Sequence, residues 1–284
     1  MREWLRYFVA DRIDRAENPI DAAGLLSQDR EIDEQKVSQS FGSKEAYFKT
    51  FFHDVRRVQD YDLFISETLK PGERVLGVGS GRCANEMMLM ERGYQVTCSD
   101  LNRPAQYAEI KGLFPQVEHI DLDILTGPAS ERYDALICLS VVYGFDDDGL
   151  ERFFENAHRS LSDGGHLILD YSGSPDNTLS YLVHDVLLKY EAKAARTIKS
   201  RFYTNPRVVT AMHHGYHRND REILIVASKH GFELVSQRNY DFLTEFERSF
   251  FFRQSIKKLP GFKTGIRQLG RAIPYTRMFD LKKT

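Results

Sequence analysis

The stretch RVLGVGSGRCANEMMLMERGYQVTCSD, residues 74–100, constrains the fold more than any other part of the sequence. A short apolar run enters a glycine-rich turn, a helical pattern follows, and a second apolar run ends on Asp100. A strand, a helix and a second strand in this order form a βαβ unit, whose two strands lie parallel in one sheet. We therefore expect an α/β fold with a parallel sheet that helices cover on both faces.

The alternation of strand and helix patterns continues along the chain. We expect further strands at 117–122, 133–139 and 166–171, with helices near 104–113 and 149–161 between them. Residues 43–70 indicate one long amphipathic helix, which Pro71 and Gly72 end. The predicted fold is a doubly wound, mostly parallel sheet in one domain, residues 44–254, after a helical N-terminal arm, residues 1–43.

Three glycines, Gly77, Gly79 and Gly81, alternate where the first strand ends. Glycine accepts a positive φ and lets the backbone approach a ligand, and the helix that follows presents free N–H groups to an anion. Counted from Gly79, the loop matches the dinucleotide pattern G-x-G-x-x-A, and Asp100 follows at about the expected 20 residues. The loop alone leaves two cofactors open, a nicotinamide dinucleotide and S-adenosylmethionine.

Later segments separate these two cofactors. They are VEHIDLDILTG (117–127), RYDALICLSVVYGF (132–145), LSDGGHLILDYS (161–172) and HRNDREILIVASKHGFELVSQRNYDF (217–242). With the glycine loop, this ordered set resembles the class I S-adenosylmethionine-dependent methyltransferases of the small-molecule kind, over residues 70–252. An NAD(P)-dependent oxidoreductase is the enzyme alternative, and these later segments carry no Tyr-x-x-x-Lys pair for hydride transfer.

The resemblance implies roles for individual residues. Gly79 and Gly81 would let the loop approach the methionine half of the cofactor, and Asp100 would accept both ribose hydroxyls. The adenine would be bound by Leu101, Asp123 and the backbone N–H of Ile124, and Ser140 would supply backbone near the sulfonium. Asp121 and Asp123 can also be loop acids that face solvent.

Gly77 departs from the family, which usually places an acid at this position. The glycine removes a carboxylate that helps to order the loop and the cofactor's amino group. Either water or another acid substitutes, or binding is weaker. A catalytically silent nucleotide-binding module is therefore the non-enzyme alternative.

The segment TAMHHGYHR, residues 210–218, offers His213 and His214 as candidate general bases for an oxygen acceptor. Tyr143 is a candidate for positioning the acceptor, or for closing the rim of the pocket. No carboxylate lies at convincing ligand spacing from the histidines, so we expect no metal site. The predicted activity is O-methylation of a small-molecule or sugar acceptor.

The composition narrows the partners and the location. The net charge of −2 gives no general field for nucleic acid. The cysteines, Cys83, Cys98 and Cys138, lack zinc-site spacing and lie in segments that look buried, which suits a reducing compartment. No apolar stretch approaches the roughly 20 residues that span a bilayer. We expect a cytoplasmic protein, and the sequence does not indicate its oligomeric state.

Two further segments lie outside the repeating pattern. Residues 175–206 carry an apolar helical stripe and are the expected lid over the acceptor pocket. Residues 255–284 are the expected basic amphipathic tail, because nine Lys or Arg and one acid occur from Arg253 onward. Such a tail either docks on the body of the protein or contacts an anionic membrane, an acidic partner or a glycan.

Overall fold

The computed structural model describes residues 41–51, 55–172, 218–239, 261–262, 264–265 and 276–284. Most of the predicted N-terminal arm, the lid insert and the histidine segment 210–217 lie outside these residues. The fold and the site are built from the described part of the chain.

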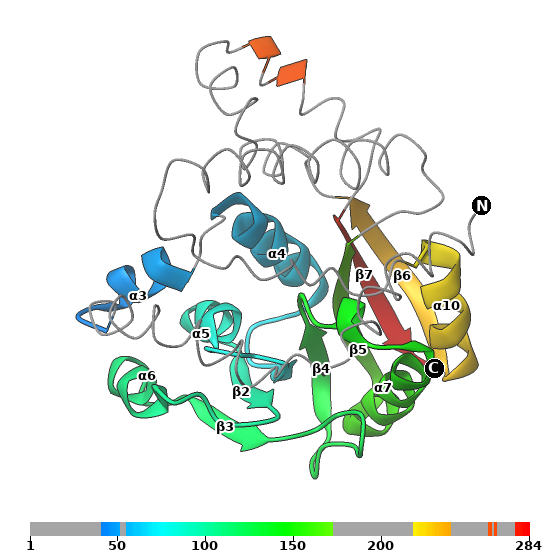
Figure 1. Cartoon of the computed structure of the whole chain (residues 1–284), viewed down its shortest axis with the longest axis horizontal. Coiled ribbons are helices and arrows are strands. Elements are labelled where there is room, and N and C mark those ends of the chain that lie inside the picture. Colours follow the sequence, from blue (N-terminus) through cyan, green and yellow to red (C-terminus); the bar gives the residue numbers. More distant parts are fainter. Residues whose placement is uncertain (1–40, 52–54, 173–217, 240–260, 263, 266–275) are drawn as a thin grey trace, which may run out of the picture.

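A seven-stranded sheet forms the centre of the molecule (Figure 1). Its strands are β1 (Arg74–Val78), β2 (Gln95–Asp100), β3 (Glu118–Asp121), β4 (Tyr133–Cys138), β5 (Leu161–Ser172), β6 (Phe232–Asn239) and β7 (Thr276–Lys283). Their order is β3-β2-β1-β4-β5-β7-β6. Strands β1 to β5 are parallel, whereas β7 runs antiparallel to both β5 and β6. The doubly wound, mostly parallel sheet is therefore confirmed.

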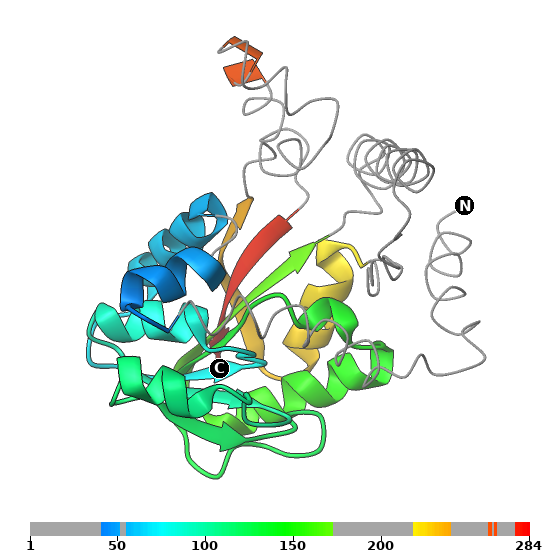
Figure 2. The ribbon, with the colours of Figure 1, turned by 60° about the vertical axis from the view of Figure 1, so that its left-hand side comes forward.

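Helices cover both faces of the sheet (Figure 2). One layer contains α3 (Lys44–Phe51), α4 (Val55–Thr68), α5 (Ala84–Glu91) and α6 (Tyr107–Leu113). The other contains α7 (Asp147–Ser160) and α10 (Asp220–Lys229), and the 3-10 helix η1 (Val142–Gly144) follows β4. The single helix that we predicted over residues 43–70 is two helices, α3 and α4, on either side of residues 52–54.

The two-residue period of the strands divides the core. In β1, Val75 packs with the α4 and α5 residues Phe64 and Leu89, whereas Leu76 packs with Phe153 of α7. Successive side chains of a strand point to opposite faces, so one apolar run supplies both layers. A third cluster around Tyr47 and Cys83 closes the space between α3, α5 and α6.

Strand β7 corrects our division of the chain. We assigned residues 255–284 to a basic tail, yet residues 276–283 form a strand inside the sheet. Met278, Phe279 and Leu281 are fully buried there. Two of the cations that suggested a solvated tail, Arg277 and Lys283, are also buried. The excess of Lys and Arg did not indicate a solvated tail here, because these side chains form internal ion pairs and hydrogen bonds.

Candidate functional site

The glycine loop after β1 is held against the end of β2. The Ser80 N–H donates to the Ser99 carbonyl over 2.8 Å, and the Ser80 hydroxyl accepts from the Ser99 N–H over 3.1 Å. The Gly81 N–H donates to the Asp100 carboxylate over 2.8 Å. These bonds fix a narrow turn at the carboxyl ends of two neighbouring parallel strands, where open α/β sheets bind their ligands.

Gly79 and Gly81 meet two different requirements in this turn. Gly79 has φ +68°, and a Cβ at this position would collide with the Val141 side chain beyond the end of β4. Gly81 has φ +52°, and a Cβ there would meet nothing within 4 Å. The backbone at Gly81 therefore faces open space in which a ligand can approach it.

The Asp100 carboxylate ends β2 and is half-buried. One oxygen accepts from the Gly81 N–H, and the other accepts from the Leu101 N–H over 2.7 Å. A carboxylate offers about four acceptor positions, so capacity remains for the hydroxyls of a ribose. Leu101, the next residue, is 62% exposed, so its apolar side chain is open to contact with a ligand.

The next strand contributes Asp123 and Ile124 at the same edge of the sheet. Asp123 is half-buried, and its carboxylate accepts from the Leu125 N–H over 3.0 Å. Ile124 is buried, and its carbonyl accepts from the Asn156 amide over 2.8 Å. Asp121 differs from Asp123, because it is exposed and its carboxylate lies 3.6 Å from the buried His119 ring.

Ser140 follows β4 with φ +61°, a region that non-glycine residues seldom adopt. Its N–H donates to the carboxylate of Asp170, near the end of β5. The Tyr61 hydroxyl of α4 donates to the same carboxylate. Such backbone strain persists only where neighbours hold it, and it occurs often at ligand sites. Our reading of the sequence missed Asp170, although its position after the run LIL at a strand end is a usable signal.

Only one of the three predicted catalytic residues, Tyr143, lies in the described part of the chain. Tyr143 lies in η1, half-buried against the core. His213 and His214 lie outside the described residues. Tyr171, a second tyrosine near the strand ends, is fully buried, and burial raises its pKa to about 12. Within the described part of the chain, no group of three or more His, Cys, Asp or Glu could hold a metal ion.

Gly77 differs from our expectation for this position. Of the three loop glycines for which we noted that glycine accepts a positive φ, Gly79 and Gly81 have one and Gly77 does not. The space above Gly77 is instead filled by the side chain of Glu86, from the first turn of α5. Sequence reading did not single out Glu86, a buried acid at a helix position that faces the sheet.

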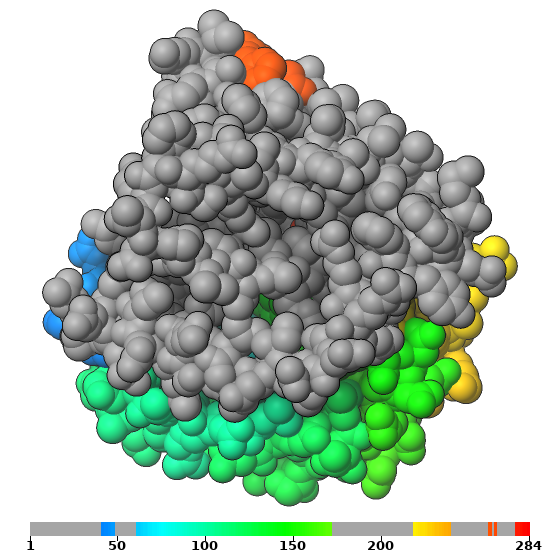
Figure 3. Space-filling view, viewed as in Figure 1, coloured from blue at the N-terminus to red at the C-terminus, as the bar shows by residue number. Residues whose placement is uncertain are grey.

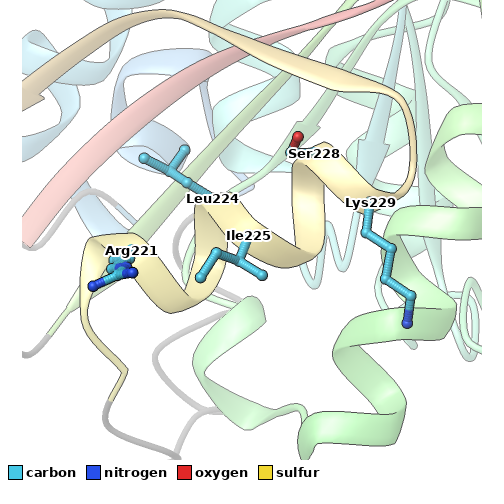
Figure 4. Close-up of a pocket in the computed structure, with 5 residues that line it drawn as sticks. All are labelled: Arg221, Leu224, Ile225, Ser228 and Lys229. Carbon is cyan, nitrogen blue, oxygen red and sulfur yellow. The ribbon is translucent and has the colours of Figure 1, made fainter.

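A separate hollow lies along α10, lined by Arg221, Leu224, Ile225, Ser228 and Lys229 (Figure 4). All five residues come from this one helix, whereas the glycine loop lies between β1 and α5. The space-filling view shows the described residues from cyan to green as one continuous surface (Figure 3). No helix among the described residues is long and apolar enough to cross a membrane.

The arrangement fits a nucleoside ligand with an amino-acid end. Asp100 offers acceptors for a ribose diol, Asp123 offers an acceptor for an exocyclic amine, and Gly81 leaves its backbone open. These residues lie on a doubly wound sheet with an inserted antiparallel β7. Residues 51–237 match the family described as a methyltransferase domain, and because the match covers more than half of the chain, the protein belongs to that family.

Solved structures share the fold at low sequence identity. A 1,6-didemethyltoxoflavin-N1-methyltransferase from Burkholderia thailandensis is 13% identical with a TM-score of 0.54, covering 94% of this chain and 90% of that one. A SAM-dependent methyltransferase from Methanosarcina mazei is 14% identical with a TM-score of 0.53, covering 78% and 96%. A geranyl diphosphate C-methyltransferase from Streptomyces coelicolor is 15% identical with a TM-score of 0.51, covering 86% and 89%. A comparison with curated protein sequences finds no match.

The family match decides between the alternatives that the glycine loop left open. The protein is an S-adenosylmethionine-dependent methyltransferase, as predicted, and S-adenosylmethionine is its cofactor. The oxidoreductase and the silent binding module are the alternatives that this result disfavours. The roles of the individual site residues remain predictions.

Proposed function

We propose that this methyltransferase acts on a small-molecule acceptor and that its preferred acceptor atom is oxygen. The observation that carries the location of the site is the convergence of the Gly81 backbone, Asp100 and Ser140 at one edge of the sheet. The choice of oxygen rests on the histidines of residues 210–217, which are candidate bases. This edge holds a nucleoside cofactor and leaves the side above β4 and β5 for the acceptor. The cofactor, when bound, supplies an electrophilic methyl group on a positively charged sulfur.

The roles of the cofactor residues follow from their hydrogen-bonding capacity. Asp100 accepts the ribose hydroxyls while it keeps its bonds to the loop, and Asp123 accepts the adenine amine. Leu101 covers the adenine ring. Asp170 is a positioning residue, because it holds the backbone of Ser140 beside the reacting centre. Methyl transfer depends mainly on such positioning and on the exclusion of water.

A general base would assist an oxygen acceptor, and His213 and His214 are our candidates. Arg218 supports this proposal, because its guanidinium donates to the Phe145 carbonyl over 2.8 Å. Phe145 follows η1, which contains Tyr143. Four peptide units separate His214 from Arg218, so covalent geometry limits the distance between their Cα atoms to about 14 Å. This limit permits a base from residues 213–214 on the Tyr143 side of the site.

The nature of the acceptor needs a direct test. The neighbours named above are an N-methyltransferase and a C-methyltransferase, so their shared fold does not select oxygen. Purified protein with labelled S-adenosylmethionine should methylate members of a panel of phenols, alcohols and sugars. His213→Gln and His214→Gln, made singly, should identify the base through the loss of the acidic limb of the pH–rate profile. Exclusive methylation of amines or carbon acids, with both variants fully active, would reject the oxygen proposal.

Two further predictions concern the surroundings of the enzyme. The cytoplasm remains our expected location, on the basis of cysteine usage. Contact between residues 255–275 and an anionic membrane or a glycan remains a hypothesis about the basic segment that precedes β7. Sedimentation with phosphatidylserine vesicles at low and high salt tests it, because electrostatic binding weakens as salt screens the charges.

A further inference from the structure

Glu86 and Gly77 form a matched pair beneath the glycine loop. A Cβ at position 77 would lie 2.6 Å from the Glu86 Cγ atom and would also collide with its Oε1 atom. The Glu86 side chain therefore occupies the volume that a side chain at position 77 would need. Only glycine at position 77 allows this arrangement without a displacement of Glu86.

Glu86 is an acid in an unusual environment. It is 4% exposed, and among the described residues its Oε2 atom receives no hydrogen bond. Burial raises its pKa to about 7, and the nearby Asp100 charge adds to this effect. A buried carboxyl group without a full set of partners destabilises the protein, so its presence at a ligand site indicates a functional use.

The ionisable groups that face Glu86 belong to three neighbouring elements. They are Asp100 and Cys98 on β2, Cys138 on β4 and Tyr47 on α3. The pKa values of Tyr47, Cys98 and Cys138 are all raised, chiefly by burial or by a neighbouring thiol, so these three groups are neutral near pH 7. Asp100 and Glu86 are therefore the acids that set the local charge.

Ser80 links Glu86 to the loop. The Ser80 hydroxyl and the Glu86 carboxylate lie together in the space above Gly77, and the nearby hydroxyl lowers the pKa of Glu86 against the larger effect of burial. The same serine hydroxyl donates to the Gly77 carbonyl over 3.1 Å and accepts from the Ser99 N–H. A change at Glu86 is thus transmitted to the turn that contains Gly79 and Gly81.

We propose that Glu86 replaces, from α5, the acidic group that position 77 lacks, and that it holds the loop and its negative charge in place for the ammonium group of the cofactor's methionine half. In this assignment Glu86 acts on the ammonium group through its negative charge, and it touches none of the reacting atoms. The proposal rests on S-adenosylmethionine as the cofactor and is independent of the acceptor.

The first test compares two ligands that differ in the amino-acid end. Calorimetry with S-adenosylhomocysteine should show that Glu86→Gln lowers affinity about tenfold to a hundredfold, the range for an interaction with a charged partner. Affinity for 5′-methylthioadenosine, which has the nucleoside but no ammonium, should change little. Glu91→Gln is the matched control, because Glu91 lies on the same helix and is exposed. An equal loss for both ligands, or no loss for either, would contradict the proposal.

The second test needs no variant. Glu86 is protonated in the free protein below about pH 7, and the ammonium favours its ionised form, so binding releases a proton there. Affinity for S-adenosylhomocysteine should therefore rise with pH up to about pH 7, by at most about tenfold per unit, and then level off. Methylthioadenosine should show a flat profile. The slope should vanish in Glu86→Gln, which separates Glu86 from His119, the buried histidine whose pKa is lowered by burial.

The third test exchanges the two positions. Gly77→Asp alone should weaken binding of S-adenosylhomocysteine, because the new side chain collides with Glu86 and adds a second carboxylate. In a Glu86→Ala background, both contacts with Glu86 are gone and the Ser80 hydroxyl, 2.7 Å from the Cβ position, is the contact that remains. Rotation of this short side chain relieves the contact, so the same Gly77→Asp substitution should strengthen binding by restoring the charge. The cycle of four proteins measures this change of sign. A Gly77→Asp substitution that is equally harmful in both backgrounds would overturn the assignment. Binding of S-adenosylmethionine to wild-type protein tests the cofactor separately.

Discussion

The proposed cofactor edge, which comprises the glycine loop, Asp100 and Glu86, and the antiparallel strand β7 both contain buried charged residues. The two regions differ in the partners of these charges. In β7, Asp280 lies 2.7 Å from the His166 ring, Arg277 pairs with Asp220, and the Lys283 ammonium donates to the Leu161 carbonyl over 2.8 Å. At the cofactor edge, Glu86 keeps an oxygen without a hydrogen bond from the described residues. The Arg277–Asp220 ion pair also lacks hydrogen-bond geometry, but each of its two groups faces an opposite charge. Buried charges that face an opposite charge hold a structure together, whereas a buried carboxylate oxygen without a hydrogen bond beside a ligand site is available for the ligand.

The largest effect in this comparison should come from removing β7. A chain that ends before Thr276 loses the strand that joins β5 to β6, together with three fully buried apolar side chains. We expect loss of cooperative thermal unfolding and a dynamic, aggregation-prone protein. Lys282→Gln is the control, because Lys282 is the exposed cation of the same strand. A truncated protein with an unchanged melting temperature would restore the view of this segment as a detachable tail.

A single cavity in β7 should have a smaller effect. Phe279 is fully buried and belongs to the core cluster that contains Leu136 and Phe154. Phe279→Ala should lower the free energy of unfolding by about 3–5 kcal/mol, as other phenylalanine truncations in cores do. Urea denaturation at constant pH measures the change. Binding of S-adenosylhomocysteine to the folded fraction should remain, because Phe279 lies away from the loop between β1 and α5.

At the proposed cofactor edge, a substitution should change ligand affinity more than it changes the stability of the fold. Asp100→Ala removes an acceptor for the ribose and the partner of the Gly81 N–H. Affinity for S-adenosylhomocysteine should fall by about 1.5–3 kcal/mol, the range for hydrogen bonds with a charged partner. Asp121→Ala is the matched control, because Asp121 pairs with Asp100 in register but points to His119. Equal losses from both variants would remove Asp100 from its proposed role.

The smallest effect should come from an exposed pair at the other end of β1. Arg74 and Glu131 form an ion pair of 2.6 Å, with side chains 45% and 68% exposed. Exposed pairs contribute roughly 0.2–1 kcal/mol, and salt weakens them further. Glu131→Gln should therefore change stability by less than about 1 kcal/mol and leave cofactor binding intact. This variant sets the baseline against which the Asp100 result is judged.

The sequence was sufficient for those parts of the fold that depend on local pattern. The βαβ units, the position of Asp100 and the edge of the sheet that we propose for the cofactor all follow from residues close together in the chain. Strand β7 did not follow, because its sequence TRMFDLKK alternates poorly and its charges are satisfied only by distant partners. A pattern cannot reveal that Arg277 meets Asp220 or that Asp280 meets His166.

The glycine loop also combines a feature that the sequence predicts with a feature that depends on packing. The sequence identified Gly77 as a departure from the family and raised the option that another acid substitutes. It could not select the acid, because the helix α5 contains both Glu86 and Glu91. The direction of each side chain depends on how the helix is rotated against the sheet, and this is a property of the packed core. The close approach of Glu86 to Gly77 supplied that information.

The strand order also dictates when parts of the chain can fold during synthesis. Strand β6 leaves the ribosome before β7, yet in the described sheet β6 pairs with β7 and with no other strand. Residues 240–275 must be added between them, which at 5–20 residues per second takes about 2–7 s. During this interval β6 lacks its partner strand, and it carries Leu234 and Val235, whose side chains are exposed in the finished fold. A strand without its partner can pair with another chain, so this interval is the stage of synthesis at which β6 favours aggregation.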